Sequence, residues 1–114
     1  MRNPKKTSFK TKPQELVRII PLGGLEEIGR NMTLVEYQNQ VLIIDMGLQF
    51  PDENTPGIDF IIPNIEYLKT HPEKKILGIL ITHAHYDHIG AIPYLIPQLN
   101  YPTIYATPLA KAII

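Results

Sequence analysis

The sequence predicts an α/β domain, and three observations carry that prediction. Short β-branched runs are separated by turn residues, an almost continuous apolar run at residues 76–82 is typical of a buried strand, and helical stretches alternate with strands in the second half. The chain has 114 residues, enough for one small domain and too few for two. Its 44% hydrophobic content supports a core.

The first half is expected to begin with a basic arm and continue with three strands. Residues 1–14 form the predicted flexible arm and residues 15–114 the predicted domain. A first strand at 16–20 is expected to be ended by Pro21 and the glycine pair at 23–24. Strands at 31–37 and 41–45 form a predicted hairpin across residues 38–40. The arm carries five basic residues and no acid, namely Arg2, Lys5, Lys6, Lys10 and Lys12.

Two interpretations of this arm stay open. The chain after residue 12 has six basic and eleven acidic residues, and therefore a net charge of −5. The arm is either a solvated tail or a weak electrostatic contact for RNA, DNA or a partner surface.

The second half contains a long loop, two strands and three helical stretches. The loop at 46–63 is rich in glycine and proline, and loops of this length are often functional. Pro97 makes the second of the helical stretches short or kinked. Thr107 caps the last one, which runs to Ile114 without a C-cap, so we expect the chain to be truncated there. The predicted elements are a helix at 65–69, a strand buried on both faces at 76–82, a helix at 93–99, a strand at 103–106 and a helix at 107–114.

Composition excludes several classes of protein and site. The chain has no cysteine, which rules out disulfides and thiolate metal sites. No apolar run approaches the length of about 20 residues that spans a bilayer, and the N-terminal charges are not followed by the apolar segment of a secretory signal. The cytoplasm is the compartment expected by default.

The main candidate site is a loop in which three histidines and one aspartate directly follow the strand at 76–82. Imidazole and carboxylate groups suit zinc, manganese or iron, and two adjacent ions can activate water and stabilise both oxygens of a displacement. Burying so many polar groups without a partner would be costly, which favours a metal site. His71, at a polar helix end, is expected to be an ordinary surface histidine. The candidate ligands are His83, His85, Asp87 and His88, with Asp87 also the candidate catalytic residue.

Two further features lie upstream. Asp45 ends an apolar strand, and its carboxylate could orient a metal-bound imidazole through the free ring N–H, or could simply be a turn residue. The glycine-rich segment 23–31 lacks the pattern of a phosphate-binding loop, and on its own it indicates a turn.

The segment 83–88 resembles the His-x-His-x-Asp-His motif of the metallo-β-lactamase superfamily. Its flanks at 22–32, 44–51, 57–63 and 87–95 look like ribonuclease J, a family of the β-CASP group, and the resemblance covers residues 16–114. It implies the N-terminal part of an αββα sandwich and a metal-dependent ribonuclease that works as a 5′-to-3′ exonuclease, an endonuclease or both. It also implies a cytoplasmic homo-oligomer, a dimer or tetramer, that acts on RNA.

The resemblance also implies a di-metal centre, zinc by preference with manganese or magnesium as alternatives. His83 and His85 would hold one ion, Asp87 and His88 the other, and Asp45 would support them. The family uses a further aspartate and further histidines, yet this chain has no histidine after His88 and no aspartate after Asp87. With two protein donors per ion, the 114-residue chain is expected to be inactive alone.

Two rival functions remain open at this point. The motif alone also fits a hydrolase of a small thioester or lactam, although the flanking segments argue against it. A non-catalytic RNA-binding module that uses the basic arm is the second alternative. Ala84 and Tyr86 stand where the family often has Gly and Glu, and Tyr86 could change what lines the substrate channel.

Overall fold

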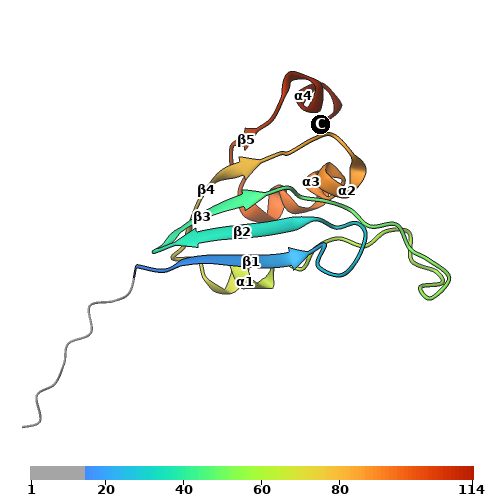
Figure 1. The fold of residues 1–114 in the computed structure, drawn as a ribbon, viewed down its shortest axis with the longest axis horizontal. Coiled ribbons are helices and arrows are strands. Elements are labelled where there is room, and N and C mark those ends of the chain that lie inside the picture. The colour runs from blue at the N-terminus through green and yellow to red at the C-terminus, as the bar shows by residue number, and fades with distance from the viewer. Residues whose placement is uncertain (1–14) are drawn as a thin grey trace, which may run out of the picture.

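A computed structural model describes residues 15–114 of the chain, so the predicted basic arm lies outside the described residues. Within them, five strands form one sheet in the order β1-β2-β3-β4-β5 (Figure 1). The first three are antiparallel, and β4 and β5 run parallel to β3. The strands are β1 (Val17–Gly23), β2 (Met32–Tyr37), β3 (Gln40–Ile44), β4 (Lys75–Leu80) and β5 (Ile104–Tyr105).

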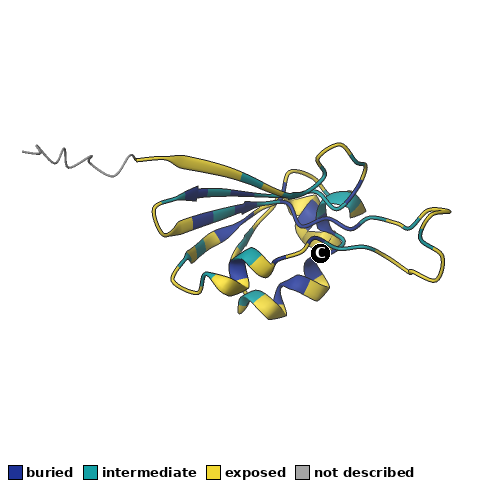
Figure 2. Cartoon of the chain, turned by 90° about the horizontal axis from the view of Figure 1, so that it is seen from below, coloured by how far each residue is buried: buried dark blue, intermediate teal, exposed yellow. Residues whose placement is uncertain are grey.

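Short helices cover one face of this sheet (Figure 2). The core consists of apolar side chains from that face, such as Leu34, Ile43 and Ile79, packed against Leu68 and Leu95 of the helices. The α/β class is confirmed. None of the described helices is long and apolar enough to cross a membrane. The helices are α1 (Glu66–Thr70), α2 (Tyr86–Ile89), α3 (Ile92–Leu95), the 3₁₀ turn η1 (Pro97–Leu99) and α4 (Pro108–Ile113).

The hairpin and the C-terminal elements follow the prediction closely. Strands β2 and β3 pair from Tyr37–Gln40 onward, so two residues link them rather than the three expected. Gln38 adopts a left-handed conformation, φ 54°, which makes the tighter turn possible. The stretch 93–99 is broken into α3 and η1, as Pro97 predicts, and Thr107 caps α4 by accepting a hydrogen bond from the Ala110 N–H at 3.2 Å.

Strand β1 does not end at Pro21, so the predicted stop at that proline is wrong, whereas the strand does end at the predicted glycine pair. The strand continues to Gly23, with a register shift between Pro21 and Gly23. The reason is its position at the edge of the sheet. An edge strand has only one neighbour, and the missing proline N–H need not break a ladder.

The prediction that the strand at 76–82 is buried on both faces is also wrong for the described residues. Ile79 is fully buried, but Leu77 and Leu80 are 44% and 39% exposed. A continuous apolar run shows that both faces of a strand can be buried, whereas the actual burial depends on what covers each face. In the described chain the helices cover one face only. The four-layer sandwich therefore stays a prediction.

The loop 46–63 is an extended excursion closed near its base. An antiparallel bridge joins Gln49 to Ile61, with N–H···O distances of 2.8 Å in both directions. This bridge fixes the first residues of the loop, and with them Leu48 and Phe50, beside the candidate site.

Candidate metal centre

The candidate site lies at one end of the central strands β2, β3 and β4, where three segments of the chain meet. Asp45 follows β3, the loop from Thr82 follows β4, and Asn31 precedes β2. Because β3 and β4 are parallel and β2 is antiparallel to β3, all three segments lie at the same end of these strands. Ligands of layered α/β proteins commonly bind at the carboxyl ends of strands.

The histidine loop differs from its expected shape in one respect. Tyr86–Ile89 forms a single helical turn, α2, with hydrogen bonds from Ile89 N to His85 O at 3.1 Å and from Gly90 N to Tyr86 O at 2.8 Å. The extended residue His85 precedes this turn. The turn places Asp87 on the side that faces His83 and His85.

Three of the predicted ligands form one compact group. Ligand atoms of His83, His85 and Asp87 all lie within 4.8 Å of one another, and both imidazoles are exposed. Zinc bonds of about 2.0–2.1 Å bring two donors on one ion to within about 4.2 Å of each other, so a small movement of exposed side chains suffices. The donor set and its spacing fit a divalent metal ion.

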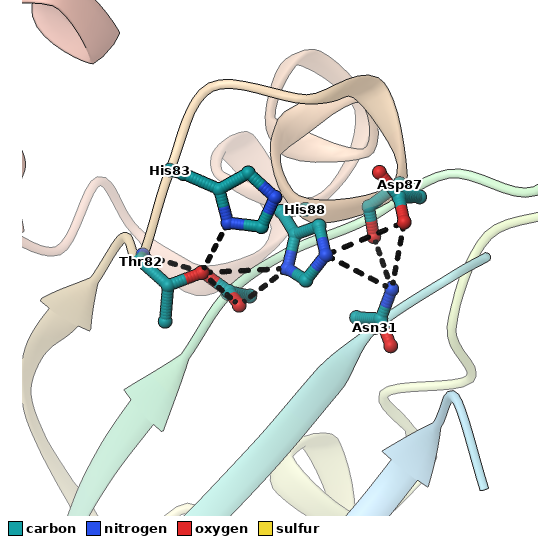
Figure 3. Close-up of polar contacts among 6 residues, drawn as sticks. Asn31, Thr82, His83, Asp87 and His88 are labelled. Atoms are coloured by element: carbon teal, nitrogen blue, oxygen red, sulfur yellow. Dashed lines mark hydrogen bonds and ion pairs between the residues drawn. The ribbon is translucent and has the colours of Figure 1, made fainter. Parts of the chain in front are cut away.

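Asp45 is the buried anchor of the site, and its hydrogen-bond partners Thr82 and His88 lie beside each other in Figure 3. It is 4% exposed, and its carboxylate accepts hydrogen bonds from the Thr82 N–H at 2.8 Å, the Thr82 hydroxyl at 2.8 Å and His88 Nδ1 at 2.7 Å. Since a carboxylate only accepts, Nδ1 of His88 carries a proton, and in the neutral ring Nε2 keeps a free lone pair.

The same hydrogen bonds determine the tautomer of His83. The Thr82 hydroxyl gives its proton to Asp45, so at 3.0 Å from His83 Nδ1 it acts as the acceptor. The proton of His83 is therefore on Nδ1, and Nε2 is free to bind a metal. One buried carboxylate thus sets the protonation of two candidate ligands.

Two acceptor atoms face each other at the centre of the site. His88 Nε2 lies 3.3 Å from Asp87 Oδ2, and neither atom carries a proton when His88 is neutral. The Asn31 amide offsets part of the repulsion between these two acceptors, because its nitrogen lies 3.3 Å from Asp87 Oδ2 and 3.5 Å from His88 Nε2. Two facing acceptors attract a cation, which is a second reason that these residues fit a metal ion.

Asn31 and Thr82 carry roles that the sequence did not assign. Asn31 Nδ2 also donates to the Asp87 carbonyl at 2.9 Å, so it holds both the backbone and the side chain of that residue. Both residues lie within motifs noted above, but only their three-dimensional contacts single them out. His71 lies apart at the end of α1, where its ring packs on Tyr67 at a centroid distance of 4.5 Å.

The glycine-rich segment forms the turn that the sequence indicates. A bidentate ion pair closes it, with Arg30 Nε 2.6 Å and Arg30 Nη2 2.9 Å from the Glu27 carboxylate. The side-chain hydrogen bond from Arg30 lowers the pKa of Glu27, and the same bond raises the pKa of Arg30. The guanidinium is thereby engaged within its own loop.

Comparison with known proteins agrees with this geometry. Residues 25–114 match the model of the metallo-beta-lactamase superfamily. The chain belongs to the metallo-β-lactamase superfamily. Membership implies divalent metal binding, and the described residues contain a His–His–Asp group of the kind that holds such an ion.

Several relatives of the chain carry one name. The chain is 44% identical to ribonuclease J 1 of Streptococcus pyogenes serotype M3 over 108 residues, which is 95% of this chain and 19% of the relative. It is 50% identical to ribonuclease J of Helicobacter pylori strain 26695 over 98 residues, 86% of this chain and 14% of the relative. Identity to ribonuclease J of Thermus thermophilus is 46% over 87 residues, 76% of this chain and 15% of the relative. The chain thus spans less than a fifth of the length of these relatives.

Proposed function

We propose that this chain supplies metal-binding residues to a metal-dependent ribonuclease of the ribonuclease J type, which hydrolyses RNA phosphodiesters as an exonuclease, an endonuclease or both. The observation that carries the proposal is that His83, His85, Asp87 and His88 lie close together at one end of the central strands. The similarity to ribonuclease J proteins supports RNA as the substrate class. Residues 15–114 then belong to a metallo-β-lactamase domain, and the cytoplasm is the proposed compartment.

Each candidate residue has a proposed role in this site. His83 and His85 each place a ring nitrogen near Asp87, and the extended His85 places its ring beside His83, at a centroid distance of 4.6 Å. Asp87 lies next to His88 as well, so these two residues would hold the second ion, and Asp87 is also the proposed catalytic carboxylate. Asp45 and Asn31 keep these groups in place. These residues would hold two divalent ions, with zinc preferred for this donor set, and the bound ions would supply an activated water and neutralise charge on the phosphate.

The proposed ligands can be tested by zinc binding to the 114-residue chain, measured by competition with a chromophoric chelator. Substituting His83→Ala or His85→Ala is expected to weaken zinc binding by at least about 100-fold, because each removes a direct ligand. His71→Ala is the matched control, since His71 lies at the end of α1 and bonds to the Tyr67 carbonyl. Equal zinc affinity in all variants would remove these residues from the site.

Ribonuclease chemistry can be tested in a chimera. Residues 17–114 would replace the matching segment of Helicobacter pylori ribonuclease J, and 5′-monophosphorylated RNA would be the substrate. The chimera is expected to cleave RNA and to lose cleavage with Asp87→Asn, while the 114-residue chain alone is expected to bind zinc without robust cleavage. A folded, zinc-loaded chimera that leaves RNA intact, or that cleaves a thioester or lactam instead, would contradict the proposal.

A further inference from the structure

The glycine-rich segment 23–31, which joins β1 to β2, has a closely specified shape. Two of its residues that carry side chains adopt left-handed backbone conformations, Glu26 with φ 54° and Arg30 with φ 38°. Such conformations cost free energy and persist only where surrounding contacts determine them. The Gly24 N–H donates to the Glu27 carboxylate at 2.9 Å, and Arg30 Nε donates to the same carboxylate at 2.6 Å. These bonds hold the two ends of the turn together.

The closed turn packs against the side chain of Asn31. A Cβ at Gly24 would clash with Asn31 Oδ1 and would lie 3.2 Å from Asn31 Cγ. The φ of Gly24 is 84°, a conformation that glycine adopts far more readily than other residues. The oxygen end of the Asn31 side chain therefore fits only because residue 24 is a glycine.

The nitrogen end of the same side chain points into the candidate metal centre (Figure 3). Asn31 Nδ2 carries two hydrogens, and it lies 2.9 Å from the Asp87 carbonyl oxygen, which accounts for one of them. The other is shared between Asp87 Oδ2 at 3.3 Å and His88 Nε2 at 3.5 Å. A donor hydrogen thus points between two acceptors that lie 3.3 Å from each other.

The Asp87 carboxylate depends on this amide for its orientation. The Asp87 side chain is 38% exposed, so burial does not fix it. The backbone of Asp87 is held separately, because the Asn31 backbone N–H donates to its carbonyl at 3.0 Å. Loss of the side-chain amide would therefore free the carboxylate while the backbone contact remains. A ligand that is already oriented loses less conformational freedom when it binds an ion.

We propose that the glycine-rich segment is a positioning element for the second metal position, and that it acts through Asn31. The side-chain amide keeps Asp87 Oδ2 and His88 Nε2 facing each other while no ion is bound. Because Nε2 has one lone pair, Asn31 must release it before an ion can bind there. The proposal rests on the proposed function, which assigns Asp87 and His88 to the second ion.

Zinc titration of the 114-residue chain, followed by NMR, tests this role. The ¹⁵N resonances of the His83 and His85 imidazoles report the first metal position, and those of His88 report the second. Asn31→Ala is expected to weaken zinc binding at the second position about 10- to 100-fold, the range for residues that orient metal ligands, and to leave the first position unchanged. In the unmodified chain, the side-chain amide hydrogens of Asn31 are expected to shift together with His88.

Gly24→Ala tests whether the segment acts through this amide, because the added Cβ displaces Asn31 Oδ1 and changes no candidate ligand. It is expected to weaken the second position by a similar factor. In a chain that already carries Asn31→Ala the clash is gone, so Gly24→Ala is expected to have no further effect on zinc affinity, and the two losses do not add. Gly57→Ala is the matched control, since Gly57 has φ 80° but a Cβ there meets no atom within 4 Å.

Three results would count against these proposals, and they are distinguishable. Unchanged second-position affinity in Asn31→Ala, or losses from Asn31→Ala and Gly24→Ala that add, would overturn the positioning role and leave the metal ligands in place. Zinc that shifts His83 and His85 but never His88 would remove the second position, and with it the role of Asn31. If zinc shifts none of the three histidines in the unmodified chain, the proposed function fails as well.

Discussion

Asp45 is a buried carboxylate in a left-handed backbone conformation, φ 62°, with three hydrogen-bond donors around it. Aspartate and asparagine tolerate this conformation better than most residues. The backbone turn carries the chain away from β3, and the side chain stays behind to hold Thr82 and His88. One residue thus combines the geometry of the strand end with the proposed positioning of a candidate metal ligand.

The substitution Asp45→Asn tests this role at the level of the residue. Asparagine keeps the left-handed turn but loses the negative charge that stabilises the Nδ1–H forms of His83 and His88. Zinc affinity is expected to fall about 10- to 100-fold, as for other residues that orient metal ligands. The tautomers can be read from the ¹⁵N shifts of the imidazoles, with the exposed Asp59→Asn as control. Unchanged affinity with unchanged tautomers would refute the positioning role.

At the level of elements, β2 carries a charge on its buried face. Met32 and Leu34 of that face belong to the core, yet Glu36 follows them and is 4% exposed. Its carboxylate accepts from the Tyr67 hydroxyl at 2.6 Å and lies 2.9 Å from Lys74 Nζ. These contacts hold α1, and the segment after it, against the end of β2 that lies farthest from the candidate metal centre.

These contacts predict how stability depends on pH. Burial raises the pKa of Glu36, but hydrogen bonds from Tyr67 and Lys74 together with the charges of Lys74 and Arg18 lower it more, so the net pKa is below the usual value. A lowered folded-state pKa stabilises the protein above the unfolded value of about 4.3. That contribution is lost as the pH falls through the folded-state value.

Glu36→Gln is therefore expected to cost roughly 3 kcal/mol at neutral pH, because it leaves Lys74 without its partner. The difference from the unmodified chain should shrink as the pH falls below the unfolded-state value of about 4.3 and through the lowered folded-state pKa of Glu36. Urea unfolding across this pH range measures both effects, with the exposed Glu53→Gln as control. A difference that stays constant with pH would show that the charge of Glu36 is not responsible.

At the scale of the whole molecule, Gly47 joins the segments that build the site. Its N–H donates to the Asn31 carbonyl at 2.9 Å, and Asn31 N in turn donates to the Asp87 carbonyl at 3.0 Å. A Cβ at Gly47 would lie 1.7 Å from the Asp87 carbonyl oxygen and 2.6 Å from Asn31 N. No side chain fits between these backbones, so the three segments can lie this close together only because residue 47 is a glycine.

Gly47→Ala is expected to destabilise the chain by roughly 1–3 kcal/mol through overpacking. Hydrogen exchange of the Asn31, Met46 and Leu48 amides should accelerate together, because their acceptors belong to the segments pushed apart. Gly57→Asn is the control, since asparagine tolerates a positive φ and a Cβ there meets no atom within 4 Å. If the three amides keep their protection in Gly47→Ala, the packing argument is wrong.

The sequence determined the elements whose signals are local. The hairpin, the break at Pro97 and the cap at Thr107 depend on neighbours within a few residues, and the structure has them at or near the predicted positions. The candidate ligands His83, His85, Asp87 and His88 were readable for the same reason, because their spacing lies within one short segment.

Tertiary structure decided what depends on residues far apart in the chain. β1 passes through Pro21 because the strand is at the sheet edge, and Leu77 and Leu80 are exposed because helices cover one face only. Asn31 reaches Asp87 across 56 positions and Asp45 reaches His88 across 43, and no local pattern encodes such contacts. The sequence by itself therefore names the candidate metal-binding groups. The sheet brings them together and sets the tautomers of His83 and His88, because hydrogen bonds form between atoms that are near in space, whatever their separation along the chain.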